Sequence, residues 1–218
     1  MTTPSSPYRS AGWAAIISAV FGIMAFGILQ VGLFNMFTGK PEVIGFVNLM
    51  FKIHHVGIIF QSLFMIPVAF ALHALARQRA SGASQTTLAV GIVALSLLVL
   101  CALVWIVNFV EDDFYMVPQG FVGVWLMVVN WRLSRPGSRA LARFGMVVGF
   151  GLLLVGTFPI AYVVFVNPTG LHSFEPDPES IANTIIHNVL VIGTFMGVLT
   201  YPVWTFLLGR RLLRESAA

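Results

Sequence analysis

The stretch FKIHHVGIIFQSLFMIPVAFALHALARQR, residues 51–79, decides the fold of this chain. It is an almost continuous apolar run with two histidines, His54 and His55, near its start and two arginines, Arg77 and Arg79, at its end. An α-helix rises about 1.5 Å per residue, so about 20 apolar residues cross the roughly 30 Å of hydrocarbon in a bilayer. The stretch is therefore predicted to span a membrane as one helix.

Five other runs of similar length and character occur among the 218 residues, of which 58% are hydrophobic and only 9% charged. Such a composition lies far outside that of soluble domains. The runs are continuously apolar and do not alternate as barrel strands do, which excludes a transmembrane barrel. The sequence predicts an all-α polytopic membrane protein, residues 1–218 forming a single bundle of six transmembrane helices. These predicted spans lie near residues 13–36, 51–76, 86–109, 114–132, 141–166 and 182–208.

The distribution of charge predicts the orientation of this bundle. In a six-span arrangement ten of the twelve Lys and Arg residues fall on one side, and seven of the eight acidic residues fall on the other. The positive-inside rule makes the arginine-rich side cytoplasmic, so both termini are expected in the cytoplasm of a multi-pass protein of the cell membrane. The net charge of +4 comes from these arginines. It needs no nucleic-acid partner, and the partner expected from composition is the lipid bilayer.

Three histidines are predicted to lie in one layer near the outer surface. His54 and His55 are 23 and 22 residues from Arg77, and His187 is 23 residues from Arg210. At about 1.5 Å per residue all three lie roughly 33–35 Å from the arginines, near the outer edge of the hydrocarbon core. The acidic turn Glu111, Asp112 and Asp113 is expected at the same level.

Imidazoles and carboxylates together are the ligands that a divalent metal such as zinc prefers, and a further carboxylate can act as a base. His54, His55 and His187 are the candidate metal ligands, and Glu111, Asp112 and Asp113 are the candidate catalytic residues. Such a site would make the protein a metal-dependent, membrane-embedded hydrolase acting on a lipid or small amphiphile. No HExxH-like pair on one helix supports this hypothesis. Ordinary interfacial histidines that hydrogen-bond water, Asn188 or loop backbone are the simpler interpretation.

Two other classes of function stay open. A single haem b between His55 and His187 is one, because haem is held by histidines on facing helices. The other is a non-catalytic ligand-binding, transport-related or accessory membrane subunit. Its outward polar pocket would be lined by the amide side chains Gln61, Gln119, Asn183 and Asn188. Without a carboxylate or Lys deep in any span, ion-coupled transport is disfavoured. The sequence therefore does not decide whether the protein is an enzyme.

Small residues and one long loop complete the predictions. Gly145 and Gly149, and likewise Gly193 and Gly197, are four residues apart on one helix face, as close helix contact in lipid favours. Both pairs are interpreted as packing seams and as candidate surfaces for a homo-oligomer. The loop between the last two spans, residues 167–181, contains three prolines and three acidic residues, and either folds over the outer mouth as a lid or is a solvated loop.

Residues 118–158 carry a resemblance to a known group of proteins. A glycine-containing fourth span with a central Trp-Leu is followed by a short basic loop and a Gly-rich fifth span, through Gly123, Trp125, Leu126, Arg143, Gly145 and Gly149. In this pattern the chain resembles a broad family of six-span bacterial membrane proteins of unknown function. The resemblance implies six spans and a bacterial inner membrane. It brings no catalytic residues.

Overall fold

The computed structural model describes residues 7–36, 44–79, 84–107, 115–134, 139–166 and 180–216. Almost all of these residues are helical and no strand occurs among them, so the predicted all-α class is confirmed. The helices are α1 (Pro7–Met36), α2 (Ile44–Arg79), α3 (Gln85–Ile106), α4 (Met116–Leu133), α5 (Arg139–Phe165), α6 (Ile181–Gly193) and α7 (Thr200–Glu215), with a π-helical segment, η3 (Thr194–Leu199), between the last two.

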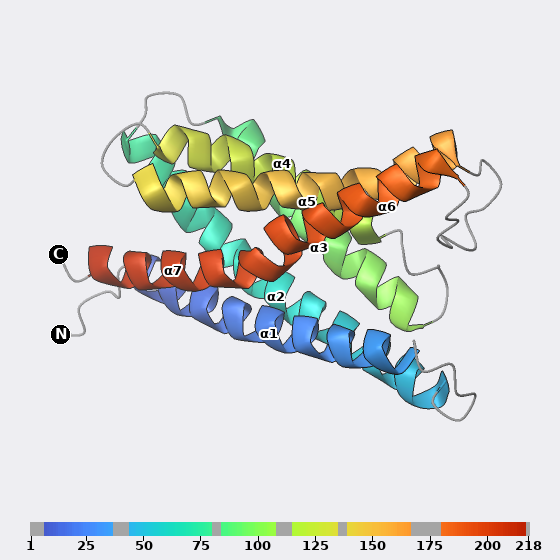
Figure 1. Cartoon of the computed structure of the whole chain (residues 1–218). Helices are drawn as coiled ribbons and strands as arrows, with labels where there is room; N and C mark the ends of the chain where they lie inside the picture. Colours follow the sequence, from blue (N-terminus) through green and yellow to red (C-terminus); the bar gives the residue numbers. More distant parts are fainter. Residues whose placement is uncertain are drawn as a thin grey trace.

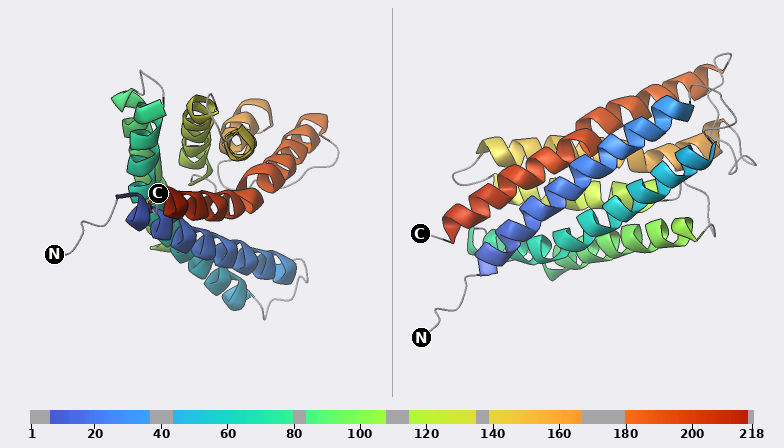
Figure 2. Two further views of the ribbon diagram at one scale, coloured as in Figure 1. Left: turned by 90° about the vertical axis from the view of Figure 1, so that its left-hand side faces the viewer. Right: turned by 90° about the horizontal axis from the view of Figure 1, so that it is seen from below.

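From α1 to α6 successive helices run in alternating directions along the bundle, α7 continues in the direction of α6, and α1 begins at the same end at which α7 finishes (Figure 1). We call this the terminal end, and the other the opposite end. Each helix packs beside the next in the chain, from α1 to α6, and α7 returns to pack on α1. The helix order is therefore a closed ring. The end-on view in Figure 2 shows this arrangement, with α7 and α1 on one side and α4 and α5 on the other.

Local sequence explains where several helices begin. Pro7 opens α1, a position that suits proline because the first turn leaves its N–H groups without intrahelical partners. Ser84 caps α3 by accepting a hydrogen bond from the backbone nitrogen of Thr86 at 3.1 Å. Ser180 caps α6 in the same way, accepting from the backbone nitrogen of Asn183 at 3.3 Å. The α2 helix begins at Ile44, seven residues before the predicted span, so it is longer than the apolar run alone.

Five helical segments are long and apolar enough to cross a membrane: Tyr8–Met36, Ile44–Gln78, Gln85–Ile106, Arg139–Phe165 and Ile181–Glu215. Five of the six predicted spans are thus matched by length and composition. The α4 helix is not in this set, because its 18 residues include Gln119, Asn130 and Arg132. Large apolar side chains such as Phe60, Leu100 and Phe150 are exposed on the outside of the bundle. A surface of this kind suits lipid better than water.

Glycines bring the helix backbones into contact inside the chain. A Cβ placed on Gly156 would lie 2.2 Å from the Cα of Gly120, and one on Gly123 would lie 2.4 Å from the carbonyl oxygen of Gly149. Both seams join α5 to α4: the first is formed by backbone atoms, and the second also includes the side chains of Leu152 and Met127. The predicted packing role of Gly149 is therefore confirmed, and its partner is α4 of the same chain.

The other predicted glycines are used in the same way. Gly145 packs against the side-chain amide of Asn130, whose atoms would lie 2.5 Å from a Cβ placed on the glycine. Gly193 and Gly197 face Gly151 of α5, since a Cβ on Gly151 would lie 2.3 Å from the nitrogen of Gly197. Both predicted seams are therefore intramolecular, and the helix faces proposed for self-association are already covered by neighbouring helices.

The last span is interrupted, which the sequence did not predict. The η3 segment makes π-type turns between α6, which packs on α5, and α7, which packs on α1. The helix axis bends there (Figure 1). Pro202 has no N–H to donate to the preceding turn, and the Thr200 hydroxyl donates to the carbonyl of Met196 nearby. The bend lets one helix close the ring against two different neighbours.

Candidate functional site

The histidine pair of α2 is held in a fixed orientation inside the bundle. His54 is 2% exposed and His55 is 1% exposed. The Nδ1 atom of His54 lies 2.9 Å from the carbonyl oxygen of Ala25 on α1, and Nδ1 of His55 lies 2.7 Å from the carbonyl oxygen of Phe51, one turn back on α2. A carbonyl can only accept, so Nδ1 carries the proton in both rings. In the neutral form each Nε2 is then the lone-pair nitrogen.

Aromatic rings from two other helices surround this pair. The His55 ring stacks on Trp105 of α3, with ring centres 3.9 Å apart and planes 15° apart. Tyr115, just before α4, meets the His55 ring edge-on at 5.3 Å and the His54 ring at 6.4 Å. The two imidazoles are themselves edge-on, 5.2 Å between centres. We call His54, His55, Trp105 and Tyr115 the histidine–aromatic cluster.

His187 belongs to a different group of rings. Its Nδ1 lies 3.0 Å from the carbonyl oxygen of Asn183, and its ring meets Phe158 at 5.3 Å and Tyr162 at 6.2 Å, both edge-on and both on α5. The helices that carry the two groups, α2 and α6, are not packed on each other. The three histidines are therefore similar in their number of residues from the arginines, but their side chains do not meet at one site.

The predicted set of three histidine ligands is accordingly not assembled. Within the described ranges, which include His54, His55 and His187, no three His, Cys, Asp or Glu side chains lie close enough to share a metal ion. The physical reason is that counting residues from an arginine gives depth but not the direction in which a helix face points. The predicted catalytic residues Glu111, Asp112 and Asp113, and residues 167–179 of the predicted lid, lie outside the described residues.

The histidines also differ from ordinary interfacial ones. His54 and His55 were expected near the membrane surface, hydrogen-bonded to water, Asn188 or loop backbone. They are instead buried and bonded to helical backbone through Nδ1. The bis-histidine haem hypothesis gains no support either, because His55 is stacked on an indole of α3 whereas His187 lies among rings of α5.

The four amides predicted to line one polar pocket are dispersed. Gln61 is buried against Gly22 of α1, where a Cβ on Gly22 would lie 2.4 Å from the Gln61 Nε2. Gln119 and Asn183 are buried on α4 and α6, and Asn188 is exposed. None of these amides lines the groove between α3 and α4 or the groove beside Tyr8 and Pro67.

Sequence reasoning missed Trp105 and Tyr115. The order of the helices could have indicated them. α3 ends and α4 begins at the opposite end, where α2 carries its histidines, so aromatic residues on either side of the α3–α4 connection fall beside His54 and His55. It also missed the buried hydroxyls of Ser18 and Ser62. The Ser18 hydroxyl donates to the Gln61 carbonyl at 2.9 Å and so ties α1 to α2.

Comparisons with known proteins give no independent guide to function. No protein-family model, no curated protein and no solved structure matches this chain.

Proposed function

We propose that this chain is an integral membrane protein with six crossings and both termini in the cytoplasm. Five helical segments have the length and apolarity to cross a bilayer. The sixth crossing is α4, which packs along α3 and α5 in the same ring. Its polar residues do not oppose this, because Gln119 and Asn130 are buried against neighbouring helices, where polar groups within a membrane are normally found. The arginine-rich terminal end is the cytoplasmic side.

Thiol labelling tests this topology, because Cys101 is the only cysteine and a Cys101→Ala chain provides a clean background. Single cysteines at Ser84, Ser134 and Ser216 should be protected from an impermeant thiol reagent in intact cells, and a cysteine at Ile181 should be labelled. If α4 does not cross, every residue after it changes side. Ser134→Cys and Ser216→Cys would then be labelled and Ile181→Cys protected, which would contradict the proposal.

We further propose that the protein binds a metal ion through Nε2 of His54 and His55. The observation that carries it is that both Nδ1 atoms are hydrogen-bonded to backbone carbonyls. Metal-binding histidines almost always donate their second nitrogen in this way, which fixes the tautomer and the ring orientation. Burial among Trp105 and Tyr115 holds the two rings further. The ligand class is a borderline divalent ion such as zinc, which imidazole nitrogen prefers.

Two nitrogens alone do not complete a zinc site, which takes four ligands. The acidic residues Glu111, Asp112 and Asp113 follow α3 in the sequence, and Trp105 near the end of α3 stacks on His55. We therefore propose a carboxylate from this segment as the third ligand. Hydrolysis of a lipid or small amphiphile would require another carboxylate as the base, so metal binding is the primary proposal and catalysis depends on it.

Asparagine and glutamine substitutions separate a ligand role from a structural one. The amide nitrogen of Asn stands where Nδ1 stands in His, and that of Gln stands near Nε2. We expect His54→Asn and His55→Asn to keep the backbone hydrogen bond and most of the stability, and to lower zinc content on the order of tenfold, as loss of even second-shell groups does. His187→Asn is the matched control, and its metal content should stay that of the unaltered protein.

The opposite pattern would contradict metal binding. If the purified protein contains no stoichiometric metal, or if both Asn variants retain it, the pair is structural. In that case His54→Gln should still destabilise the protein by about 0.5–1.5 kcal/mol, the usual net contribution of one hydrogen bond, because the bond to Ala25 is lost. Metal binding without hydrolysis of amphiphilic esters would identify a non-catalytic binding protein.

A further inference from the structure

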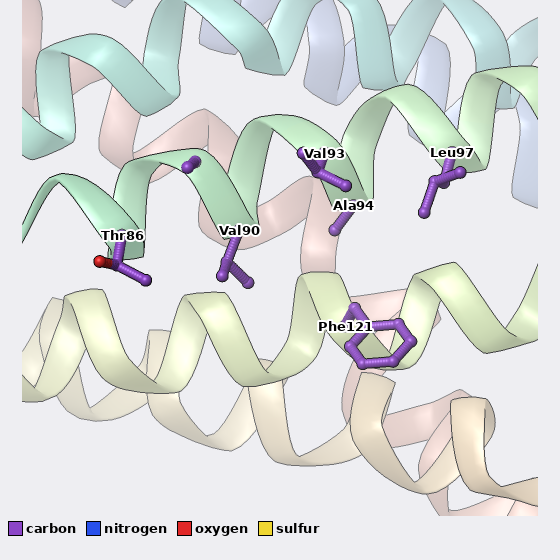
Figure 3. Close-up of a pocket in the computed structure, with 7 residues that line it drawn as sticks. Thr86, Val90, Val93, Ala94, Leu97 and Phe121 are labelled. Atoms are coloured by element: carbon purple, nitrogen blue, oxygen red, sulfur yellow. The ribbon is translucent and has the colours of Figure 1, made fainter.

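An apolar groove runs along the outside of the bundle between α3 and α4, away from the histidine–aromatic cluster. It has a volume of about 320 Å³ and is lined by Thr86, Ala89, Val90, Val93, Ala94, Leu97 and Phe121. In Figure 3 Val90, Ala94 and Leu97 follow one another along α3, and the ring of Phe121 from α4 lies below Ala94 and Leu97. Apart from the Thr86 hydroxyl at one end, the lining side chains are hydrocarbon.

The length of this groove matches one leaflet of a bilayer. Its lining begins at Thr86, in the first turn of α3, and ends at Leu97, 11 residues further on. At about 1.5 Å per residue this is roughly 16 Å, close to half of a hydrocarbon core about 30 Å thick. The groove therefore extends from the terminal end to about the middle of the membrane. One extended acyl chain of this leaflet matches both the length and the hydrocarbon lining of the groove.

Charge at the terminal end indicates what the acyl chain is attached to. Arg77 lies in the last turn of α2, which precedes α3 in the chain, and Arg132 lies in the last turn of α4, which runs antiparallel to α3. The described acidic side chain at this end is Glu215, whose Oε1 accepts a hydrogen bond from Nε of Arg211 at 3.0 Å. A phosphate at this level would thus meet an excess of positive charge. Arginine is well suited to phosphate because its planar donors pair with two oxygens.

We propose that the α3–α4 groove binds one acyl chain of an anionic phospholipid from the cytoplasmic leaflet. Thr86 and the arginines of the terminal end lie at headgroup level, and Phe121 closes the groove near the membrane centre. Basic residues beside membrane-embedded helices are a recognised means of selecting anionic lipids. The choice of leaflet rests on the proposed orientation, which thiol labelling tests separately. The groove itself depends on neither the metal proposal nor its outcome.

Two valines of similar exposure provide the test. Val90 lines the groove and is 40% exposed, and Val147 of α5 is 44% exposed and lines neither of the described grooves. Val90→Trp should fill the groove, whereas Val147→Trp should only add an aromatic ring to the lipid-facing surface. Purified proteins are delipidated with mild detergent, given phosphatidylglycerol or phosphatidylcholine, and weighed intact by native mass spectrometry. Melting temperature is recorded for each variant.

We expect the unaltered protein and Val147→Trp to retain one phosphatidylglycerol, and Val90→Trp to retain on the order of tenfold less. If Val90→Trp lowers the melting temperature, its loss of lipid could reflect partial unfolding. Leu97→Trp, at the other end of the groove, is then the second test and should show the same loss of lipid. Equal retention by all variants would mean that the retained molecule is only non-specific lipid from the protein surface, and would overturn the proposal. Equal retention of phosphatidylcholine would overturn its anionic part. A dimer that Val90→Trp disrupts would assign the groove to a second copy of the chain instead.

Discussion

Gly151→Leu should prevent this chain from forming its helical ring, whereas Gly27→Leu should leave the ring intact. A Cβ at Gly151 would lie 2.3 Å from the backbone nitrogen of Gly197 and 2.5 Å from the backbone carbon of Met196. These atoms belong to the π-helical segment and cannot rotate away as a side chain can. A Cβ at Gly27, on α1, meets nothing within 4 Å. The two substitutions therefore add the same side chain to a helix with opposite consequences.

The expected size of the effect follows from what must move. Ordinary overpacking of a core costs about 1–3 kcal/mol, and here a whole helix must shift away from its neighbour. We expect Gly151→Leu to exceed that range and to lose cooperative thermal unfolding, with little monodisperse protein in size-exclusion chromatography. Gly27→Leu should be as stable as the unaltered chain or slightly more so, because Leu favours helix over Gly. Equal melting temperatures for the two variants would show that α5 and η3 are not in close contact.

The same seam shows what sequence can and cannot predict. Helix positions were predictable because long apolar runs have few alternatives in a membrane, and the glycine spacing at Gly145 and Gly149 correctly indicated close packing. The partner of each seam was not predictable. A four-residue spacing defines a face of one helix, but it does not say whether α4, another span or a second chain covers that face. Only the closed order of the ring decides this.

The candidate site illustrates the same limit. Depth along a helix can be counted from the arginines, so the three histidines were placed at one level. The direction in which each ring points depends on helix rotation, and the structure directs His54 and His55 toward α1, α3 and the start of α4, and His187 toward α5. The bend at η3 was equally hidden, since residues 182–208 read as one apolar run. Pro202 interrupts the helical hydrogen bonds locally, and packing of the same helix on both α5 and α1 fixes where the bend lies.

A second large effect is expected where Trp125 packs over Gly91. The indole of Trp125 is 1% exposed, and a Cβ placed on Gly91 would lie 2.4 Å from its Nε1 and 2.5 Å from its Cε2. The contact joins α3 to α4 in the centre of the bundle. Trp125→Ala should destabilise the protein by about 3–5 kcal/mol, the usual range for deleting a buried aromatic side chain. Gly91→Leu should also destabilise it strongly, because a rigid, enclosed indole cannot give way.

The double variant Gly91→Leu/Trp125→Ala should be more stable than Trp125→Ala alone, since the leucine side chain grows into the space that the indole leaves. Trp131 provides the control because it is an exposed tryptophan on the same helix. Trp131→Ala alone should change stability little. In Gly91→Leu/Trp131→Ala the destabilisation should equal the sum of the two single effects, with no recovery of stability. Melting temperatures of the five variants in one detergent give the coupling energy, for which about 0.5–3 kcal/mol is typical of residues in contact. Strict additivity between Gly91→Leu and Trp125→Ala would contradict the α3–α4 contact, and with it the adjacency on which the lipid groove depends.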